Sequence, residues 1–120
     1  MASTELNEAL RSFEAILCRD YEGVHASIFL SSGTTLVGEE ESADPWQLYL
    51  VFDGRSLQLV AQHQDGKKQS ELYRASRSTR LKAVKAAPLL VAELQRKASE
   101  DAEAISSLDA LTRTLAQKRR

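Results

Sequence analysis

The chain has 120 residues and a formal net charge of −1, with 42% hydrophobic, 28% charged and 6% aromatic residues. This composition is typical of a soluble globular protein and excludes wholesale disorder, and the length predicts a single domain, residues 1–120, that buries about two thirds of the surface of its unfolded form. Because Cys18 is the only cysteine, an intramolecular disulfide is excluded. No apolar run reaches the roughly 18 residues of a membrane helix, so we expect a cytoplasmic protein with no membrane partner.

Charge is divided unevenly along the chain. Residues 1–66 hold three basic and eleven acidic residues, a net charge of −8, whereas residues 67–120 hold thirteen basic and six acidic residues, a net charge of +7. This asymmetry is typical of a protein with an acidic or basic partner, but it also fits two halves that neutralise each other in space.

The first predicted element is a helix from about residue 4 to residue 21, which Ser3 or Thr4 caps and Gly23 ends. Its apolar residues recur at spacings of three and four and therefore share one stripe. They are Leu6, Leu10, Phe13, Ile16 and Leu17.

Residues 24–38 change to a composition rich in β-branched and aromatic residues, which predicts strands. We expect two of them, at about 24–31 and 34–38, joined by a tight turn at Ser32 and Gly33. The acidic run that follows, residues 39–45, is expected to be an exposed loop because it ends in Pro45 and has Ala43 as its only apolar residue.

Two Asp-Gly pairs then predict two hairpins with two-residue turns. A turn at 53–54 pairs Leu50 with Leu57, and a turn at 65–66 pairs Leu59 with Leu72. Side chains alternate with period two, so both hairpins place the same apolar set on one core face. That face carries Trp46, Leu48, Leu50, Leu57, Leu59 and Leu72.

The opposite face of the sheet holds a candidate partner-binding surface. Tyr49, Val51, Val60 and Tyr73 lie near its middle and are surrounded by glutamines. Such a surface is typical of a protein interface, but it also fits a face that is partly covered by a helix or loop, or a wet face with scattered hydrophobic residues.

Helical periodicity returns at Ser76, with Pro88 predicted to kink the helix or to begin a new one. A further helix is expected over residues 99–120. Positions 84, 87, 91, 94, 98, 101, 105, 108, 112 and 115 follow a heptad that Asp101 and Thr112 interrupt. This pattern leaves two interpretations, a coiled-coil dimer and a helical hairpin that folds back on the domain, of which we expect the hairpin.

Together these elements predict an α+β fold with an N-terminal helix, a five-stranded antiparallel meander and two to three C-terminal helices packed on one face of the sheet. The sequence has no phosphate loop, no nucleophile elbow and no paired-cysteine metal motif, so we expect a protein that is not an enzyme and uses no cofactor or metal. Cys18, His25 and His63 match no common zinc spacing, and Asp53 and Asp65 are interpreted as turn residues.

The basic cluster in residues 67–97 suggests an alternative. Nine cations face two acidic residues there, and Arg77, Arg80, Lys82 and Lys85 are the candidates for contacting phosphates. Aromatic residues are not interleaved with these cations as in single-strand binding proteins, and the pI is about 6.1. The expected function is therefore a small adaptor that binds another protein or a second copy of the chain as a homodimer, and the alternative is a nucleic-acid-associated accessory protein.

Overall fold

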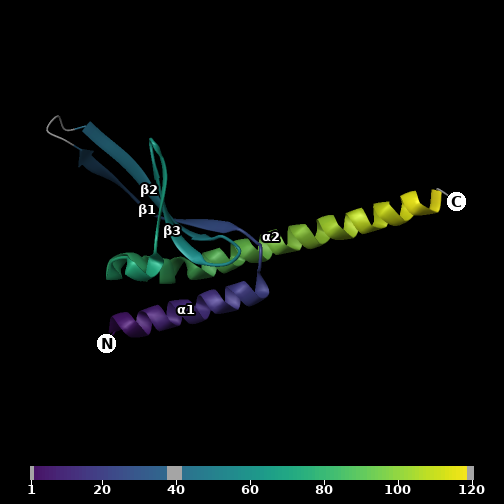
Figure 1. Ribbon diagram of the computed structural model, residues 1–120, viewed down its shortest axis with the longest axis horizontal. Coiled ribbons are helices and arrows are strands. Elements are labelled where there is room, and N and C mark those ends of the chain that lie inside the picture. Colours follow the sequence, from purple (N-terminus) through teal and green to yellow (C-terminus); the bar gives the residue numbers. More distant parts are fainter. Residues whose placement is uncertain (1, 38–41, 119–120) are drawn as a thin grey trace.

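The computed structural model describes residues 2–37 and 42–118 of the protein. It has one helix, four antiparallel strands and a second, long helix (Figure 1). The predicted α+β class is confirmed, but the sheet has four strands rather than five, and one C-terminal helix replaces the expected two or three. In chain order the elements are α1 (Ala2–Asp20), β1 (Ala26–Val37), β2 (Ser42–Phe52), β3 (Leu57–His63), β4 (Gly66–Ser70), the 3-10 helix η1 (Leu72–Arg74) and α2 (Arg77–Lys118).

The expected turn at Ser32 and Gly33 is wrong, because β1 continues through both residues. Gly33 lies opposite Trp46 in the ladder between β1 and β2. A Cβ atom on Gly33 would overlap the indole, coming within 2.9 Å of Cε2 of Trp46. The glycine therefore makes room for a cross-strand tryptophan, and the register shift in β1 lies instead between Phe29 and Ser31.

The loop expected at residues 39–45 is also wrong in its second half. Residues 42–45 belong to β2 and pair with residues 34–37 of β1, whereas residues 38–41 lie outside the described part of the chain. Pro45 pairs with Thr34, and the pairing of β1 with β2 continues on both sides of this position. The strand tolerates the proline because Pro45 lacks only its own N–H donor.

Both Asp-Gly pairs reverse the chain, but the predicted register of each hairpin is shifted by two residues. Leu50 pairs with Leu59 rather than with Leu57, and His63 pairs with Gly66. In the first hairpin, Oδ1 of Asp53 accepts hydrogen bonds from the backbone N–H groups of Arg55 (2.9 Å) and Ser56 (2.8 Å), which closes a four-residue loop in place of a two-residue turn. Because the shift is an even number of residues, each side chain keeps its predicted face.

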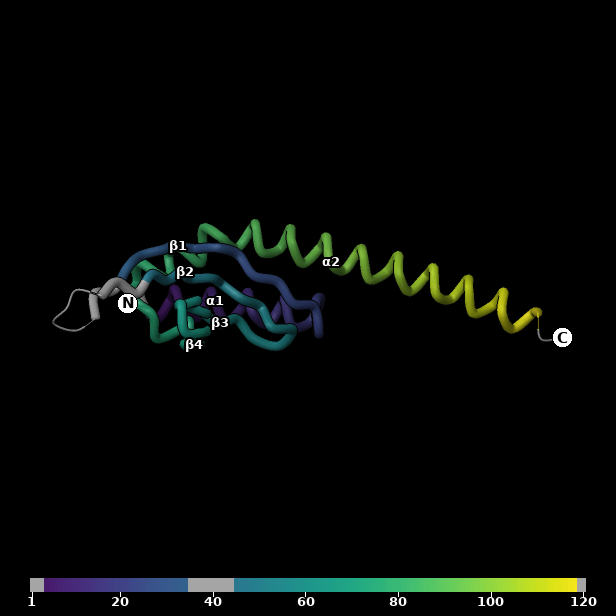
Figure 2. The backbone as a smooth tube through the Cα atoms, turned by 90° about the horizontal axis from the view of Figure 1, so that it is seen from above, coloured from purple at the N-terminus to yellow at the C-terminus, as the bar shows by residue number. Residues whose placement is uncertain are grey.

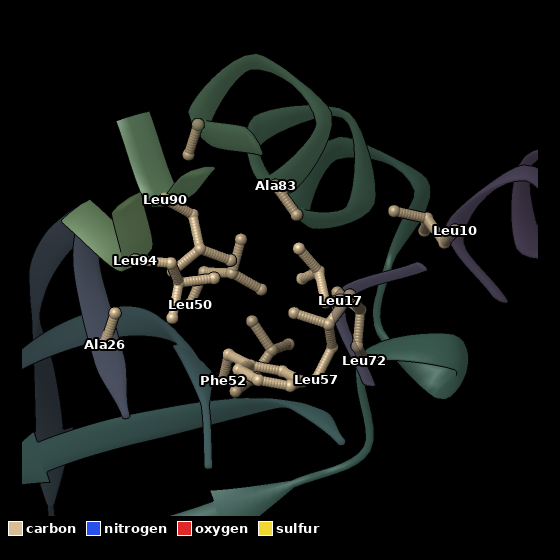
Figure 3. Packing of buried hydrophobic residues seen from close by; sticks show 12 residues of the cluster. Leu10, Leu17, Ala26, Leu50, Phe52, Leu57, Leu72, Ala83, Leu90 and Leu94 are labelled. Carbon is tan, nitrogen blue, oxygen red and sulfur yellow. The ribbon is translucent and has the colours of Figure 1, made fainter. Parts of the chain in front are cut away.

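The shift in the second hairpin shortens the last strand. β4 ends at Ser70, which pairs with Leu59, so Leu72 leaves the sheet and begins η1. Leu72 is nevertheless fully buried. It fills the space between the sheet and α1 instead of extending a strand (Figure 3).

One face of the sheet forms the core with the two helices (Figure 3). α1 contributes Leu10 and Leu17, while the predicted stripe residue Ile16 stays exposed. The strand order is β1-β2-β3-β4, and every residue of the edge strand β4 is exposed. The buried apolar residues are Leu10, Leu17, Ala26, Leu50, Phe52, Leu57, Leu59, Leu72, Ala83, Ala86, Leu90 and Leu94.

α2 is a single helix of 42 residues (Figure 2). Oγ of Ser76 accepts the N–H of Thr79 at 3.2 Å and so caps the helix. Pro88 lies inside the helix on its exposed side, so the helix loses one backbone hydrogen bond there without ending. The expected helical hairpin is therefore wrong for residues 77–118, and the coiled-coil alternative stays a prediction.

Gly54 and Gly66 offer a matched test of what holds the first hairpin. Both have positive φ, 94° and 138°, so alanine strains the backbone at either position. At Gly54 a Cβ atom would in addition lie 2.8 Å from Cα of Gly23, whereas at Gly66 it would meet nothing within 4 Å. We expect Gly66→Ala to lower the free energy of unfolding by about 1–2 kcal/mol and Gly54→Ala by about 1–3 kcal/mol more, measured by urea denaturation. Equal losses would contradict the close approach.

Candidate functional site

The most distinctive surface is the last part of α2, residues 99–118, which we call the arm. Every residue of the arm is exposed, and the arm extends past the sheet and α1 in both views (Figures 1 and 2). Its twenty residues make a helix about 30 Å long. Few soluble helices of this length lack tertiary packing, because most helical stability in proteins comes from burying one face.

The arm nevertheless has an apolar face. Its four large aliphatic residues are each between 54% and 62% exposed, and we call them the arm face: Ile105, Leu108, Leu111 and Leu115. Leu108 follows the fully buried Leu90 by 18 residues, about five helical turns, so both point in the same direction. The arm face therefore continues the stripe that α2 buries against the sheet, beyond the point where the sheet ends.

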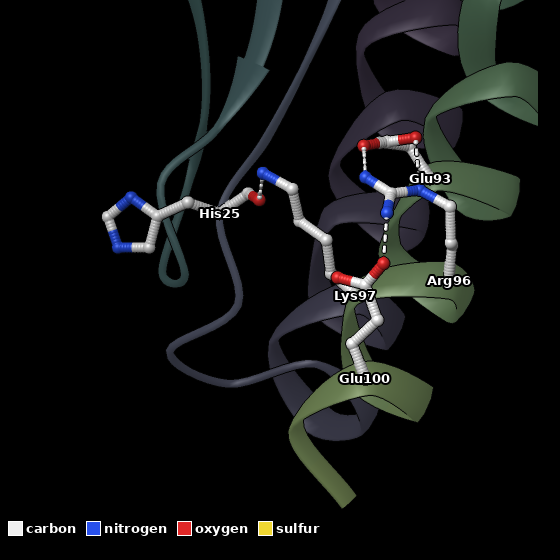
Figure 4. Close-up of polar contacts among 5 residues, drawn as sticks. All are labelled: His25, Glu93, Arg96, Lys97 and Glu100. Atoms are coloured by element: carbon white, nitrogen blue, oxygen red, sulfur yellow. Dashed lines mark hydrogen bonds and ion pairs between the residues drawn. The ribbon is translucent and has the colours of Figure 1, made fainter. Parts of the chain in front are cut away.

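Ionic contacts stiffen the junction between the body and the arm (Figure 4). Arg96 forms ion pairs with Glu93 and Glu100, and the hydrogen bonds from Arg96 lower the pKa of Glu93. Lys97 donates to the backbone carbonyl of His25 at 2.7 Å, which ties α2 to the segment before β1. These exposed contacts are individually weak. The two ion pairs of Arg96 span about two turns within α2, and the hydrogen bond of Lys97 links this part of the helix to the body.

A second surface lies on the face of the sheet opposite the core. We call it the sheet patch: Phe29, Tyr49, Val51 and Val60. Tyr49, Val51 and Val60 line a shallow hollow together with glutamines and Lys67, so three of the four predicted partner-binding residues lie together. The ring of Phe29 meets that of Tyr49 edge-on, with centroids 5.9 Å apart, and Phe29 is 53% exposed.

Phe29 was not predicted as part of this surface. The signal was present, because Ala26 and Ile28 alternate with Ser27 and Phe29, and pairing the strand with β2 would have placed Phe29 beside Tyr49. The interpretation of the sheet patch as a binding surface stays a prediction.

Tyr73, the fourth predicted residue, lies elsewhere. It belongs to η1, and the guanidinium of Arg11 in α1 lies 4.5 Å from the centroid of its ring. The hydroxyl of Tyr73 is buried and has no hydrogen-bond partner of ordinary length among the described residues. Burial raises the pKa of Tyr73 to about 12, and the negative charge of the nearby Glu14 adds to the increase.

The four predicted phosphate contacts do not form one surface. Arg80 is only 7% exposed, and its Nη1 donates to Oδ1 of Asn7 in α1 at 2.8 Å, so it fastens the two helices together. Arg77, Lys82 and Lys85 are exposed on α2. Lys82 and Lys85 are three residues apart and therefore neighbours on one side of the helix, whereas Arg77, five residues before Lys82, points about 140° away from Lys82. The nucleic-acid interpretation stays a prediction, and Arg80, which lies between the two helices, is not exposed to contact a phosphate.

Cys18 and Asp53 both form hydrogen bonds with the backbone of the loop between β2 and β3. The thiol of Cys18 donates to the carbonyl of Arg55 at 2.7 Å, and burial together with Glu14 and Asp53 raises its pKa. Burial alone would raise the pKa of Asp53, but its hydrogen bonds with the N–H groups of Ser56 and Arg55 outweigh this and lower it. In the part of the chain that the structure describes, no three His, Cys, Asp or Glu side chains gather as a metal site would require.

Comparisons with protein-family models, with curated proteins and with solved structures found no match to this chain. Neither described helix is both long enough and apolar enough to cross a membrane.

The raised pKa of Tyr73 predicts a loss of stability in alkali. The ordinary pKa of tyrosine, 10.0, applies to the unfolded chain, whereas the folded value is about 12. The contribution of Tyr73 to the free energy of unfolding is therefore fully present below pH 10 and is lost as the pH rises from about 10 to about 12. The reason is that the tyrosine of the unfolded chain releases its proton at a lower pH than the folded one. We expect the difference in unfolding free energy between the wild type and Tyr73→Phe to change over that interval in favour of the variant. A difference that stays constant with pH would contradict the assignment.

Proposed function

We propose that the protein is a small non-catalytic interaction or adaptor domain whose principal binding surface is the arm face. The observation that carries this proposal is the exposure of Ile105, Leu108, Leu111 and Leu115 on a helix that leaves the body of the protein. Large exposed apolar patches on soluble proteins are typical of interaction sites.

The energetics favour a covered arm. Burying one leucine or isoleucine side chain completely contributes about 1.5–3 kcal/mol, so covering the four residues of the arm face supplies several kcal/mol. Most of the stability of helices in proteins comes from packing an apolar face rather than from helix propensity. A partner that lies along the arm face would stabilise the helix and remove the exposed surface at the same time.

The sheet patch supports the same class of function as a smaller, second surface. It combines two aromatic rings with two valines, and Tyr49 donates a hydrogen bond from its hydroxyl to Oε1 of Gln47 at 2.7 Å. Aromatic residues with a polar rim are typical of binding surfaces on proteins. Two separate surfaces on one small body are what an adaptor requires.

The alternative, a nucleic-acid-associated accessory protein, rests on Arg77, Lys82 and Lys85 once Arg80 is used between the helices. Only Lys82 and Lys85 of these three cations are neighbours on the helix, and two neighbouring cations give a weak electrostatic footprint compared with a basic stripe along one face. The arm face is the stronger feature, so the interaction function is the one that we propose.

The test of the proposal compares two double variants in the arm. Leu108→Ser with Leu111→Ser removes half of the arm face, whereas Ala110→Ser with Gln117→Ser places two serines on the opposite side of the same helix. We expect cross-linking in cells followed by mass spectrometry to show saturable protein partners for the wild type, to retain them in the second variant and to lose them in the first.

Unchanged Trp46 fluorescence would show that the body stays folded in both variants, since Trp46 lies in β2, away from the arm. The proposal is contradicted if the first variant keeps every partner of the wild type, or if the wild type cross-links to no protein, including itself.

A further inference from the structure

We propose that the arm binds a second copy of this chain, with the two arms packed antiparallel and related by a twofold axis near residue 110. This inference rests on the proposed function, because it names the partner of the arm face. Its evidence is separate, however: it comes from the order of charges along the arm and from the way that the arm face matches its own reverse.

The arm face is nearly symmetric about its middle. Ile105 and Leu115 form its two ends, and Leu108 and Leu111 lie between them. When the face is laid against its own reverse, Ile105 lies level with Leu115 of the second copy, and Leu108 and Leu111 meet near the axis. One surface is then complementary to itself, as a twofold interface requires.

The width of the face fits this packing. With about 100° between successive residues of a helix, the four side chains cover a stripe about 120° wide. A stripe of that width is broader than the narrow seam of a parallel two-stranded coil and is typical of helices packed in bundles. Leu111 at the edge of the stripe would contact Leu111 of the second copy across the axis.

Charges at the two ends of the arm face have opposite sign. Residues 99–104 contain three acidic and no basic residues, whereas residues 113–118 contain two basic and no acidic residues. Asp101 precedes Ile105 by four residues and Lys118 follows Leu115 by three, so each lies one turn beyond the face at its own end. Antiparallel packing places Lys118 level with Ala102 of the second copy, one residue from Asp101.

Parallel packing makes the opposite arrangement. It places Asp101 directly beside Asp101 of the second copy, within the continuation of the apolar stripe, and Lys118 beside Lys118. Like charges at facing positions oppose association, and opposite charges at those positions select the orientation. The order of charges therefore favours the antiparallel dimer.

The bodies of the two copies do not obstruct this packing. The body holds α2 as far as Lys97, which donates to the carbonyl of His25. In the antiparallel dimer, Lys118 of the second copy lies beside Ala102 of the first. Ala102 is five residues beyond Lys97 along the helix, a distance of about 7 Å. The full arm face is thus accessible to a second arm.

The test is a charge swap in the full chain. Dimerisation is measured by sedimentation equilibrium at low ionic strength for the wild type, Asp101→Lys, Lys118→Glu and the variant with both substitutions. We expect a wild-type dimer, about tenfold weaker association for each single variant, since each creates two like-charge contacts, and recovery to within about twofold for the double variant. Glu103→Lys makes the same charge change on the outer side of the arm and should leave association unchanged.

The outcomes separate the two proposals. A wild-type chain that stays monomeric while its arm still cross-links to a different protein overturns the second copy as partner and leaves the proposed function standing. A dimer that the double swap fails to restore overturns the antiparallel arrangement. A dimer that persists when Leu108 and Leu111 are replaced by serine overturns the arm as its interface.

Discussion

The loop between β2 and β3 is the constraint on which the rest of the structure depends. The carboxylate of Asp53 accepts the N–H groups of Arg55 and Ser56 and so fixes the register of the two central strands. That register places Leu50 and Phe52 beside Leu59 and Leu57 on the core face. A loop one residue longer or shorter would shift the register of the strands by one residue, and one strand would then turn its core side chains toward solvent.

The same loop is also where α1 docks. The carboxylate of Glu14 accepts the N–H of Leu57 at 2.7 Å, and the thiol of Cys18 donates to the carbonyl of Arg55. Just after the helix, the N–H of Gly23 donates to the carbonyl of Gly54 at 3.1 Å, at a point where the two backbones are too close for a side chain. The first helix is thus positioned by polar contacts with one hairpin as well as by its apolar stripe.

The sequence predicted the faces of the sheet but not its details, and the reason is physical. Alternation of apolar and polar residues is insensitive to a slip of two, so Leu50, Leu57 and Leu59 lie on the predicted core face although both hairpin registers were wrong. Trp46, predicted on the same face, is not part of the core cluster. An Asp-Gly pair permits both a two-residue turn and a longer loop, and the hydrogen bonds of Asp53 decide between them. Likewise, Gly33 has the local signature of a turn, and its actual role depends on Trp46, a residue that only the folded sheet brings beside it.

Long-range contacts limited the prediction of sites in the same way. Tyr49, Val51 and Val60 were placed correctly on one face because strand alternation governs them, whereas Tyr73 lies past the end of the shortened β4 and turns toward α1. Arg80 is buried beside its hydrogen-bond partner Asn7, 73 residues away in the sequence. No local sequence pattern predicts a contact between residues so far apart. The apolar stripe of α2 was recognised, but periodicity does not reveal whether the chain covers its own stripe or leaves part of it exposed.

The body of the protein determines how the arm is presented. Helix formation is limited by its first turn, after which each added residue extends an existing structure. In α2 that first turn is capped by Ser76, and Leu90 and Leu94 fix the rotation of the helix against the sheet. The arm therefore begins from a helix already formed, and its apolar face has a fixed direction at the junction held by Arg96 and Lys97. Less chain has to be ordered when a partner binds, so more of the free energy from burying the arm face remains for association.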